Sequence, residues 1–288
     1  MRDAVARALT EDLHPLGDLS AGLVPEHAFA RGAFVSRSAG VVAGSACVTE
    51  TFAQLDPGVE LSWRLGDGAR VDEGSVIAEV MGGLRSILSA ERTALNFLCH
   101  LSGVATLTAR YVEAVSVANP ATRVLDTRKT TPGLRALEKA AVRAGGGYNH
   151  RGSLSEGVLV KDNHLLGVAI CDAVARARRE WPGRLVEVEC DRREQVEEAL
   201  RAGVSAVLLD NMSPAEVARC VRIVRERTKE GEVLVEVSGG LKLDNVAEYA
   251  AAGADLVSVG ALTHSAPVLD VGLDLATQGR PAPSDGAR

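Results

Sequence analysis

The sequence has few aromatic residues, no paired cysteine motif and no excess of basic charge, and each shortage excludes a class of function. Aromatic residues make up 3% of the 288 residues, and 38 acidic residues outnumber 32 basic ones, for a net charge of −6. The chain therefore lacks the stacking platforms and the broad basic surface that nucleic-acid binding usually needs. Its five cysteines are widely spaced without a CxxC pair, which indicates neither a disulfide framework nor a structural zinc site.

Long apolar runs are also missing. No stretch of about 18 apolar residues predicts a membrane-spanning helix. The first residues, MRDAVARALTEDL, are typical of an amphipathic helix that contains acids, and they lack the apolar stretch of a secretory signal. We therefore expect a cytoplasmic protein with no membrane partner. The 46% of hydrophobic residues can form the core of one large domain and a smaller one.

The N-terminal third changes from helical to strand-like patterns and back. Residues 1 to about 20 predict a helix that ends near Pro15, and residues 28–80 contain short β-branched runs interrupted by glycine. Residues 86–115 are strongly helical, and Ser102-Gly103 predicts a break between two helices. This helical region is expected to lead out of the smaller domain.

After Asn119, six apolar runs of strand length recur: RVLD, GVLV, LVEVE, AVLLD, VLVEVS and LVSVG. They lack alternation of apolar and polar residues, as expected of parallel strands that are covered on both faces. Helical crossovers between them predict either a closed α/β barrel or an open doubly wound sheet. The barrel fits better, because barrel enzymes collect polar side chains at the C-terminal ends of their strands. Nearly every run ends in such a residue: Asp126, Lys161, Glu189, Asp210 and Ser238.

Cations concentrate between residues 124 and 164 of this acidic chain. One set follows helical spacing and is expected on a helix surface: Arg135, Lys139 and Arg143. A second set lies at loop and strand ends: Arg128, Lys129, His150, Arg151 and Lys161. We assign the second set to a cleft that binds a small polyanion, since Arg and Lys suit carboxylates and phosphates. The alternative is a solvated basic face without a ligand.

Glycines and acids complete the expected cleft. Ser238-Gly239-Gly240 and Gly260 end the last two strands, where backbone N–H groups can approach a phosphate closely. Glu189 and Asp210 end adjacent strands and suit ribose hydroxyls or a Mg²⁺ ion that carries pyrophosphate. The alternatives are a plain strand-to-helix turn for the glycines and an internal salt-bridge network with Lys161 or Arg128 for the acids. Together, the residues imply a phosphorylated sugar and a second, carboxylated anion.

Seven segments then resemble the quinolinate phosphoribosyltransferase family, and ALTEDL and GDLS fit the start of the family, so that the resemblance runs in order from about residue 8 to residue 275. The seven segments are ERTALNFLCHLSG (91–103), DTRKTTPGLRALEKAAVRAGGGYNHR (126–151), VKDNH (160–164), EVEC (187–190), LLDN (208–211), SGG (238–240) and VGALTHSAPVLDVGLDL (259–275). The resemblance implies an α/β protein with a smaller N-terminal α/β sandwich domain and linking helix over 1–103. It further implies an incomplete parallel α/β barrel over 104–275 and a C-terminal tail over 276–288. The assembly implied is a homodimer, with a hexamer as the larger alternative.

The activity implied by the resemblance is a pentosyl transfer in de novo NAD biosynthesis. Phosphoribosyl pyrophosphate would react with quinolinate, with decarboxylation, to give nicotinate mononucleotide, pyrophosphate and CO₂. Two alternatives stay open: a related paralogue that uses a different anionic acceptor, and a non-catalytic barrel that binds a metabolite.

The resemblance also implies roles for individual residues. Arg128, His150 and Arg151 would bind the two carboxylates of quinolinate, together with Arg92 from the neighbouring subunit. Lys129 and Lys161 would be catalytic and lie beside a substrate carboxylate and pyrophosphate. Glu189 and Asp210 would be catalytic and lie beside the ribose hydroxyls and Mg²⁺. Ser238, Gly239 and Gly260 would bind the 5′-phosphate, with Gly240 in the same loop. The group that protonates the ring after CO₂ leaves is not assigned.

Overall fold

The structure is a computed structural model that describes residues 1–229 and 231–277. The chain folds into two compact units. Of the described residues, the N-terminal unit contains 1–106, 136–144 and 266–277, and the barrel unit contains 107–135, 145–229 and 231–265. Within the described residues, no helix is both long enough and apolar enough to span a membrane.

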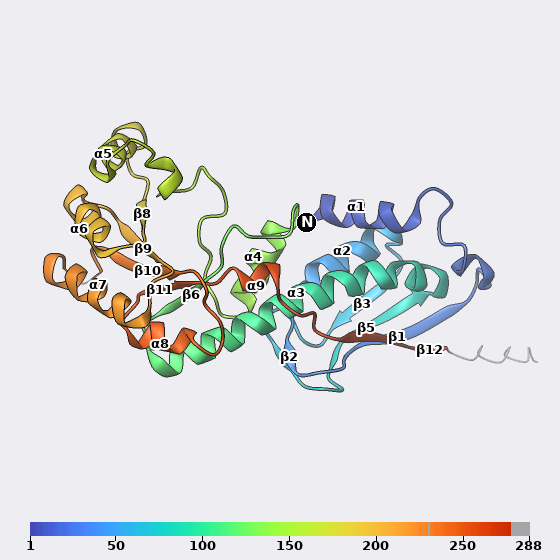
Figure 1. Ribbon diagram of the computed structural model, residues 1–288. Coiled ribbons are helices and arrows are strands. Elements are labelled where there is room, and N and C mark those ends of the chain that lie inside the picture. The colour runs from blue at the N-terminus through green and yellow to red at the C-terminus, as the bar shows by residue number, and fades with distance from the viewer. Residues whose placement is uncertain (230, 278–288) are drawn as a thin grey trace, which may run out of the picture. The chain divides into compact units, whose positions relative to one another are not determined.

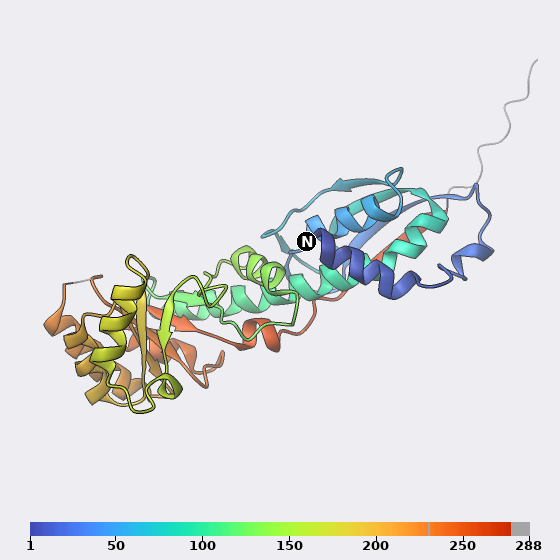
Figure 2. The same cartoon turned by 90° about the horizontal axis from the view of Figure 1, so that it is seen from above.

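The N-terminal unit is a four-stranded sheet covered by helices (Figure 1). Its strands are antiparallel, in the order β12 (Val271–Thr277), β1 (Phe29–Ser36), β5 (Val76–Gly83) and β3 (Glu60–Trp63). The helices are α1 (Arg2–Leu13), α2 (Ser45–Leu55) and α3 (Leu84–Ala118), and they lie on one side of the sheet (Figure 2). Short elements connect them: η1 (Ala21–Leu23), β2 (Gly40–Val41) and β4 (Arg70–Val71).

Alternation along the strands places apolar side chains under these helices. On β1, Ala30 and Phe34 are fully buried, while the intervening Arg31 is exposed. Phe34 contacts Phe52 of α2 edge-to-face, with ring centroids 6.3 Å apart. Ile87 and Leu98 of α3 complete this core. The expected α/β sandwich is thus present, and its core holds sheet and helices together by apolar burial.

The expected break in the helix at Ser102-Gly103 is wrong, because α3 continues without interruption from Leu84 to Ala118. Gly103 serves close packing: a Cβ atom at this position would lie 2.2 Å from the carbonyl oxygen of Pro267. The Ser102 hydroxyl accepts a hydrogen bond from the Ala43 backbone N–H at 2.9 Å. Both residues therefore attach neighbouring segments to the helix.

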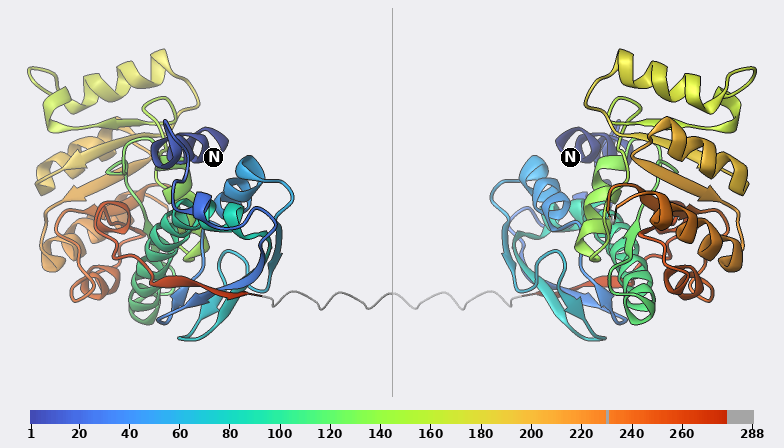
Figure 3. Two further views of the ribbon diagram at one scale, coloured as in Figure 1. Left: turned by 90° about the vertical axis from the view of Figure 1, so that its right-hand side faces the viewer. Right: turned by 90° about the vertical axis from the view of Figure 1, so that its left-hand side faces the viewer.

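The barrel unit contains six parallel strands, as predicted. Their order is β6 (Arg123–Leu125), β11 (Leu256–Ser258), β10 (Leu234–Ser238), β9 (Ala206–Asp210), β8 (Val186–Cys190) and β7 (Val158–Val160). The crossover helices flank the outer side of the sheet (Figure 3): α5 (Ile170–Glu180), α6 (Arg193–Ala202), α7 (Pro214–Arg227) and α8 (Val246–Ala251). Two short helices, η2 (Asp162–His164) and α9 (Ala261–His264), follow β7 and β11. Side chains from β7 through β11 line one interior cavity. Among the described residues, β6 pairs with β11 and otherwise forms an isolated bridge, Leu125 to Tyr148. This is the incomplete barrel that was expected.

The compact units cross the boundaries expected from the sequence. β12 pairs with β1 along its whole length, so the C-terminal strand belongs to the N-terminal sheet rather than to the range 104–275. Helix α4 (Arg135–Ala144) lies mostly in the N-terminal unit as well. Of the expected tail 276–288, residues 276 and 277 are in β12 and the rest lies outside the described residues.

The expected surface position of the α4 cations is also wrong in part. Arg143 is exposed, but Lys139 is buried and Arg135 is half-buried. Arg135 donates hydrogen bonds to the Thr130 hydroxyl and to the Gly152 carbonyl. Helical spacing alone does not show which face of a helix packs against the protein, so Lys139 and Arg135 were wrongly expected on the surface, whereas Arg143 was placed correctly.

We predict that Gly103→Ala lowers the free energy of unfolding by about 2 kcal/mol, because the added methyl group overlaps the Pro267 carbonyl and the packed segment must shift. Urea denaturation measures the change. Gly22→Ala is the matched control, since nothing lies within 4 Å of a Cβ atom there. Equal stability of the two variants would contradict the packing role of Gly103.

Candidate active site

A cavity of about 590 Å³ opens at the C-terminal ends of the barrel strands. We call it the mouth cavity. Parallel strands present their carboxyl ends at the same edge, so polar residues that follow different strands meet there. Ten of the predicted site residues line it: Arg128, Lys129, His150, Arg151, Lys161, Glu189, Asp210, Ser238, Gly239 and Gly240.

Two arginines in the mouth cavity have no carboxylate partner of their own. Among the described residues, neither Arg128 nor Arg151 forms an ion pair, and the buried Nε atom of Arg128 has no hydrogen-bond partner. Arg151 donates one hydrogen bond, to the Gly157 carbonyl at 2.9 Å. Burial and the neighbouring charge of Arg128 lower the pKa of Arg151. Two guanidinium groups that form no ion pair with the described residues create a site that favours an anion.

The acids lie on the adjacent strands β8 and β9. Glu189 forms an ion pair with Lys161, which is one of the pairings that the sequence left open. Asp210 accepts a hydrogen bond from the Asn211 side-chain amide at 2.7 Å and forms no ion pair with Arg128. One carboxylate is therefore paired with a lysine, while the other has no cationic partner among the described residues.

The loop after β10 requires its glycines. Gly239 has a φ of +90°, and a Cβ atom there would lie 2.3 Å from the side-chain oxygen of Asn211. Gly240 also has a positive φ, at +64°. The Asn211 backbone N–H donates to the Ser238 carbonyl at 3.0 Å, which fixes the loops after β9 and β10 against each other. Glycine at both positions lets the backbone approach a ligand closely.

A buried cluster of one histidine and two glutamates lies deeper in the barrel. The Nε2 atom of His150 is 3.1 Å from Glu187 Oε2 and 3.5 Å from Glu236 Oε2. The Ser258 hydroxyl donates a short hydrogen bond to the other oxygen of Glu236. Glu187 Oε1 is buried and has no hydrogen-bond partner among the described residues.

The charges in this cluster shift its acid–base behaviour. Burial opposes the charged form of His150, but hydrogen bonds and charge interactions with Glu187 and Glu236 outweigh burial and raise its pKa to about 10. Burial and repulsion from Glu236 raise the pKa of Glu187 to about 7, against the opposing effect of His150. His150 is thus an imidazolium at neutral pH, held between two acids.

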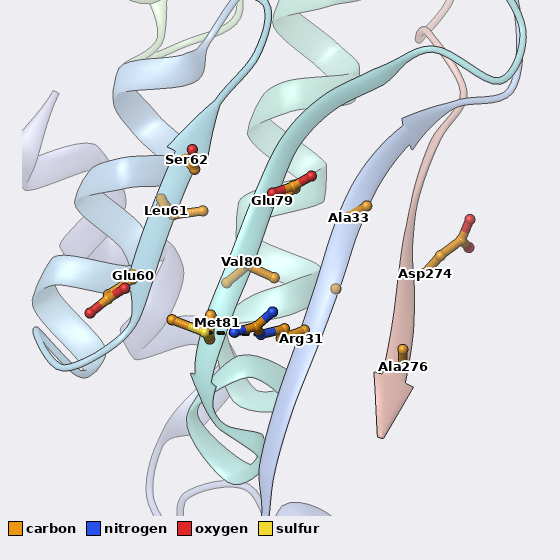
Figure 4. A pocket seen from close by; sticks show the side chains of 11 residues that line it. Arg31, Ala33, Glu60, Leu61, Ser62, Glu79, Val80, Met81, Asp274 and Ala276 are labelled. Atoms are coloured by element: carbon orange, nitrogen blue, oxygen red, sulfur yellow. Dashed lines mark hydrogen bonds between the residues drawn. The ribbon is translucent and has the colours of Figure 1, made fainter. Parts of the chain in front are cut away.

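A second hollow, of about 540 Å³, lies along β3, β5, β1 and β12 in the N-terminal unit (Figure 4). Three of its charged residues have partners. Arg31 contacts the sulfur of Met81, and Glu79 pairs with Arg64. Asp274 pairs with Arg37. The remaining charged residue is the exposed Glu60, so this hollow lacks the two adjacent guanidinium groups that distinguish the mouth cavity.

Comparison with known proteins identifies the family. Models of quinolinate phosphoribosyl transferase match the chain with their N-terminal domain over residues 16–102 and with their C-terminal domain over residues 104–274. The chain belongs to the quinolinate phosphoribosyltransferase family. The nicotinate-nucleotide pyrophosphorylase [carboxylating] of Mycobacterium leprae is 42% identical over 279 residues, which cover 95% of this chain and 96% of that protein.

Other members of the quinolinate phosphoribosyltransferase family are also similar to this chain in sequence and in structure. The human nicotinate-nucleotide pyrophosphorylase [carboxylating] is 37% identical over 257 residues, with 88% of this chain and 85% of the human protein covered. The solved structure of the nicotinate-nucleotide pyrophosphorylase from Francisella tularensis superposes with a TM-score of 0.90 at 36% identity. The superposition covers 96% of this chain and 95% of that one.

Two residues that the family resemblance singled out do not line the mouth cavity. Arg92 is an exposed residue of α3, in the N-terminal unit. Gly260 precedes α9, and a Cβ atom there would lie 3.2 Å from the Lys129 side chain, so Gly260 is next to a residue that does line the cavity. The role of Arg92 at a neighbouring subunit's pocket stays a prediction.

Glu187, Glu236 and Asn211 were missed as members of the site. A signal for the glutamates was present in the sequence, because alternate residues of a strand point to the same side. Glu187 is two residues before Glu189, and Glu236 is two residues before Ser238. No such spacing in the sequence identifies Asn211 as a site residue. It shapes the site through its left-handed backbone, with φ 56°, and through its contact with Gly239.

We predict that Glu236→Gln lowers the pKa of His150 by about one to two pH units, because one of the two carboxylates that stabilise the imidazolium is removed. Titration of the imidazole resonance by NMR, assigned with His150→Gln, measures the shift. The folded-state pKa of about 10 exceeds the ordinary 6.5, so His150 stabilises the fold fully below pH 6.5 and loses this contribution as the pH rises through 10. An unchanged midpoint in Glu236→Gln would show that the carboxylate does not hold the proton.

Proposed function

We propose that this protein transfers the phosphoribosyl group of phosphoribosyl pyrophosphate to quinolinate and decarboxylates the product to nicotinate mononucleotide. Family membership across both domains supports the proposal, as do the carboxylating nicotinate-nucleotide pyrophosphorylases that the chain resembles. The observation that carries it is one cavity lined by two arginines that form no ion pair among the described residues, two acids and a glycine loop.

The cavity chemistry matches both substrates. Quinolinate carries two carboxylates on adjacent ring carbons, and planar guanidinium groups bind carboxylates in a fixed orientation. Arg128, Arg151 and the imidazolium of His150 are therefore assigned to this dianion. The backbone of the loop Ser238–Gly240 suits the 5′-phosphate, together with Gly260. Lys129 and Lys161 suit the pyrophosphate, and Glu189 and Asp210 the ribose hydroxyls.

The reaction begins with attack of the pyridine nitrogen on C1 of the ribose as pyrophosphate leaves. Because the arginines fix both carboxylates, the nitrogen has one orientation toward C1, and orientation of this kind lowers the barrier without new chemistry. Lysine charge stabilises the leaving pyrophosphate. Quaternising the nitrogen turns the ring into an electron sink, so the 2-carboxylate can leave as CO₂ and its electron pair stays at C2.

Mg²⁺ is the cofactor that we propose. The donor set fits: Glu189 and Asp210 are carboxylates at the same wall, and Mg²⁺ prefers oxygen ligands, often one or two carboxylates with substrate phosphates. When bound, the ion would offset the charge of the pyrophosphate. The ion pair of Glu189 with Lys161 leaves Asp210 as the carboxylate without a cationic partner among the described residues.

A homodimer is proposed as the functional unit, in the cytoplasm. Arg92 is exposed on α3 and has no ion pair within the described part of the chain. The motif that contains it resembles the family segment whose arginine completes the neighbouring subunit's pocket. We therefore assign Arg92 to the partner's quinolinate site.

We predict that the purified protein releases pyrophosphate and CO₂ together with quinolinate, and releases no CO₂ with nicotinate, which lacks the 2-carboxylate. Arg128→Ala should lower kcat/KM for quinolinate by about 100-fold, since a charged hydrogen bond of about 3 kcal/mol is lost. Arg222→Ala, an exposed arginine of α7, is the matched control. If a pyridine acid other than quinolinate were the better acceptor, the protein would be a related paralogue with a different acceptor. If it bound phosphoribosyl pyrophosphate without releasing pyrophosphate, it would be a non-catalytic barrel that binds a metabolite.

A mixture of two inactive variants tests the dimer. Arg92→Ala and Arg128→Ala each disable every pocket of their own dimers, but a hybrid dimer keeps one pocket with both arginines. Random mixing makes half of the dimers hybrids, so activity should recover to about one quarter of the wild-type value. The steady-state rate of the refolded mixture, compared with each variant alone, measures recovery. No recovery would place Arg92 and Arg128 in the same subunit's pocket.

A further inference from the structure

The barrel interior also opens at the N-terminal ends of its strands. A cavity of about 400 Å³ lies there, which we call the basal cavity. Its walls are largely apolar and come from the first residues of the strands or the residues just before them: Val158, Leu185, Ser205, Ala206, Leu234 and Leu256. The mouth cavity and the basal cavity therefore occupy opposite ends of one barrel.

His150, Arg151 and Glu236 line both cavities. These side chains form the partition between the two ends. Within the partition, His150 is hydrogen-bonded to Glu187 and ion-paired with Glu236, and Ser258 anchors Glu236 in turn. An imidazole ring in this place has access to the substrate cavity on one side and to a second cavity on the other.

The proposed reaction needs one proton at C2 of the bound pyridine ring, inside the barrel. Loss of CO₂ leaves an electron pair on C2 of the ring, and a proton must replace the carboxylate. Arginines do not lose protons under physiological conditions, which excludes Arg128 and Arg151 as donors. Lys161 is held by Glu189, and Lys129 is exposed at the rim of the cavity. His150 is the remaining cation among the described residues that line the mouth cavity, and two acids keep it charged.

We propose that His150 donates the proton to C2 after decarboxylation and that water in the basal cavity returns a proton to it. The inference rests on the proposed function. The imidazolium N–H bond breaks, its electron pair stays on nitrogen, and a C2–H bond forms with the pair that CO₂ left behind. The neutral imidazole then takes one proton from water, so each turnover consumes one proton from solvent.

A second observation supports the route. The Oε1 atom of Glu187 is buried and has no hydrogen-bond partner within the described protein, and Glu187 lines the basal cavity but not the mouth cavity. Buried polar atoms of this kind are usually satisfied by ordered water. Solvent in the basal cavity would therefore have a fixed acceptor directly beside His150. The 5′-phosphate and pyrophosphate occupy the other end, so a proton need not pass the bound substrates.

His150→Asn tests the donor. Because His150 is also assigned to a carboxylate of quinolinate, its loss should weaken binding and slow pyrophosphate release as well, so the readout is the ratio of two rates at saturating quinolinate. In a single turnover, the rate of nicotinate mononucleotide formation should fall about 100-fold relative to the rate of pyrophosphate release, the usual contribution of a general acid. If His150 only bound a carboxylate, KM for quinolinate would rise and both events would slow together. That result, or an unchanged ratio of the two rates, would overturn the proposal.

Ala206→Leu tests the route. Ala206 lines the basal cavity two residues before Leu208, which lines the mouth, so both face the barrel interior and the larger side chain would fill the basal end. We expect kcat to fall about tenfold and its solvent deuterium isotope effect to rise, with unchanged KM values for both substrates. Ala215→Leu, at an exposed position of α7, is the matched control. A wild-type kcat and isotope effect in folded Ala206→Leu would overturn the route, and if that variant does not fold, the His150→Asn result decides the proposal.

The same assays separate this inference from the proposed function. Wild-type protein that releases no pyrophosphate or CO₂ with quinolinate contradicts the function itself. Wild-type protein that releases both, with His150→Asn keeping the two steps coupled, contradicts only the proton donor.

Discussion

The structure depends most on two arginines inside the barrel that form no ion pair among the described residues. Arg128 and Arg151 are partly removed from water, and the charge of Arg128, together with burial, lowers the pKa of Arg151. Such an arrangement costs free energy in the unliganded protein, because like charges repel and buried polar atoms are left without partners. A dianionic ligand relieves both costs. We therefore expect the cations to favour quinolinate over acids with one carboxylate, with a phosphorylated sugar bound next to it at the strand ends and glycine loops.

The cluster of His150, Glu187 and Glu236 gives the barrel a second function beyond anion binding. Two acids next to the imidazole of His150 keep it positively charged, so it adds to the positive charge of the mouth cavity. Unlike an arginine, it can also lose its proton. Its place in the partition links the substrate to the basal cavity. One side chain can thereby serve binding and proton transfer, and an incomplete barrel leaves room for both openings.

Much of this arrangement could be predicted from the sequence, for physical reasons. Six apolar runs without alternation identified the parallel strands, and the polar residue at the end of each run identified the mouth cavity. Glu187 and Glu236 were missed because an acid inside a strand looks like an interruption of an apolar run, although its two-residue spacing from Glu189 or Ser238 places it on the interior side. Contacts between residues far apart in the sequence could not be predicted, because they leave little pattern in the local sequence. Examples are the close approach of Gly103 to Pro267 and the pairing of β12 with β1. Lys139 was misplaced because periodicity does not show which face a neighbour covers.

The most direct test of the central claim is a crystal structure of the protein with quinolinate bound. The charge arrangement predicts the ligand in the mouth cavity, with its two carboxylates on the guanidinium groups of Arg128 and Arg151 and near His150, and its ring nitrogen toward the wall that carries Glu189 and Asp210. Quinolinate bound elsewhere, or bound in the mouth cavity with both carboxylates facing away from these two arginines, would contradict the account.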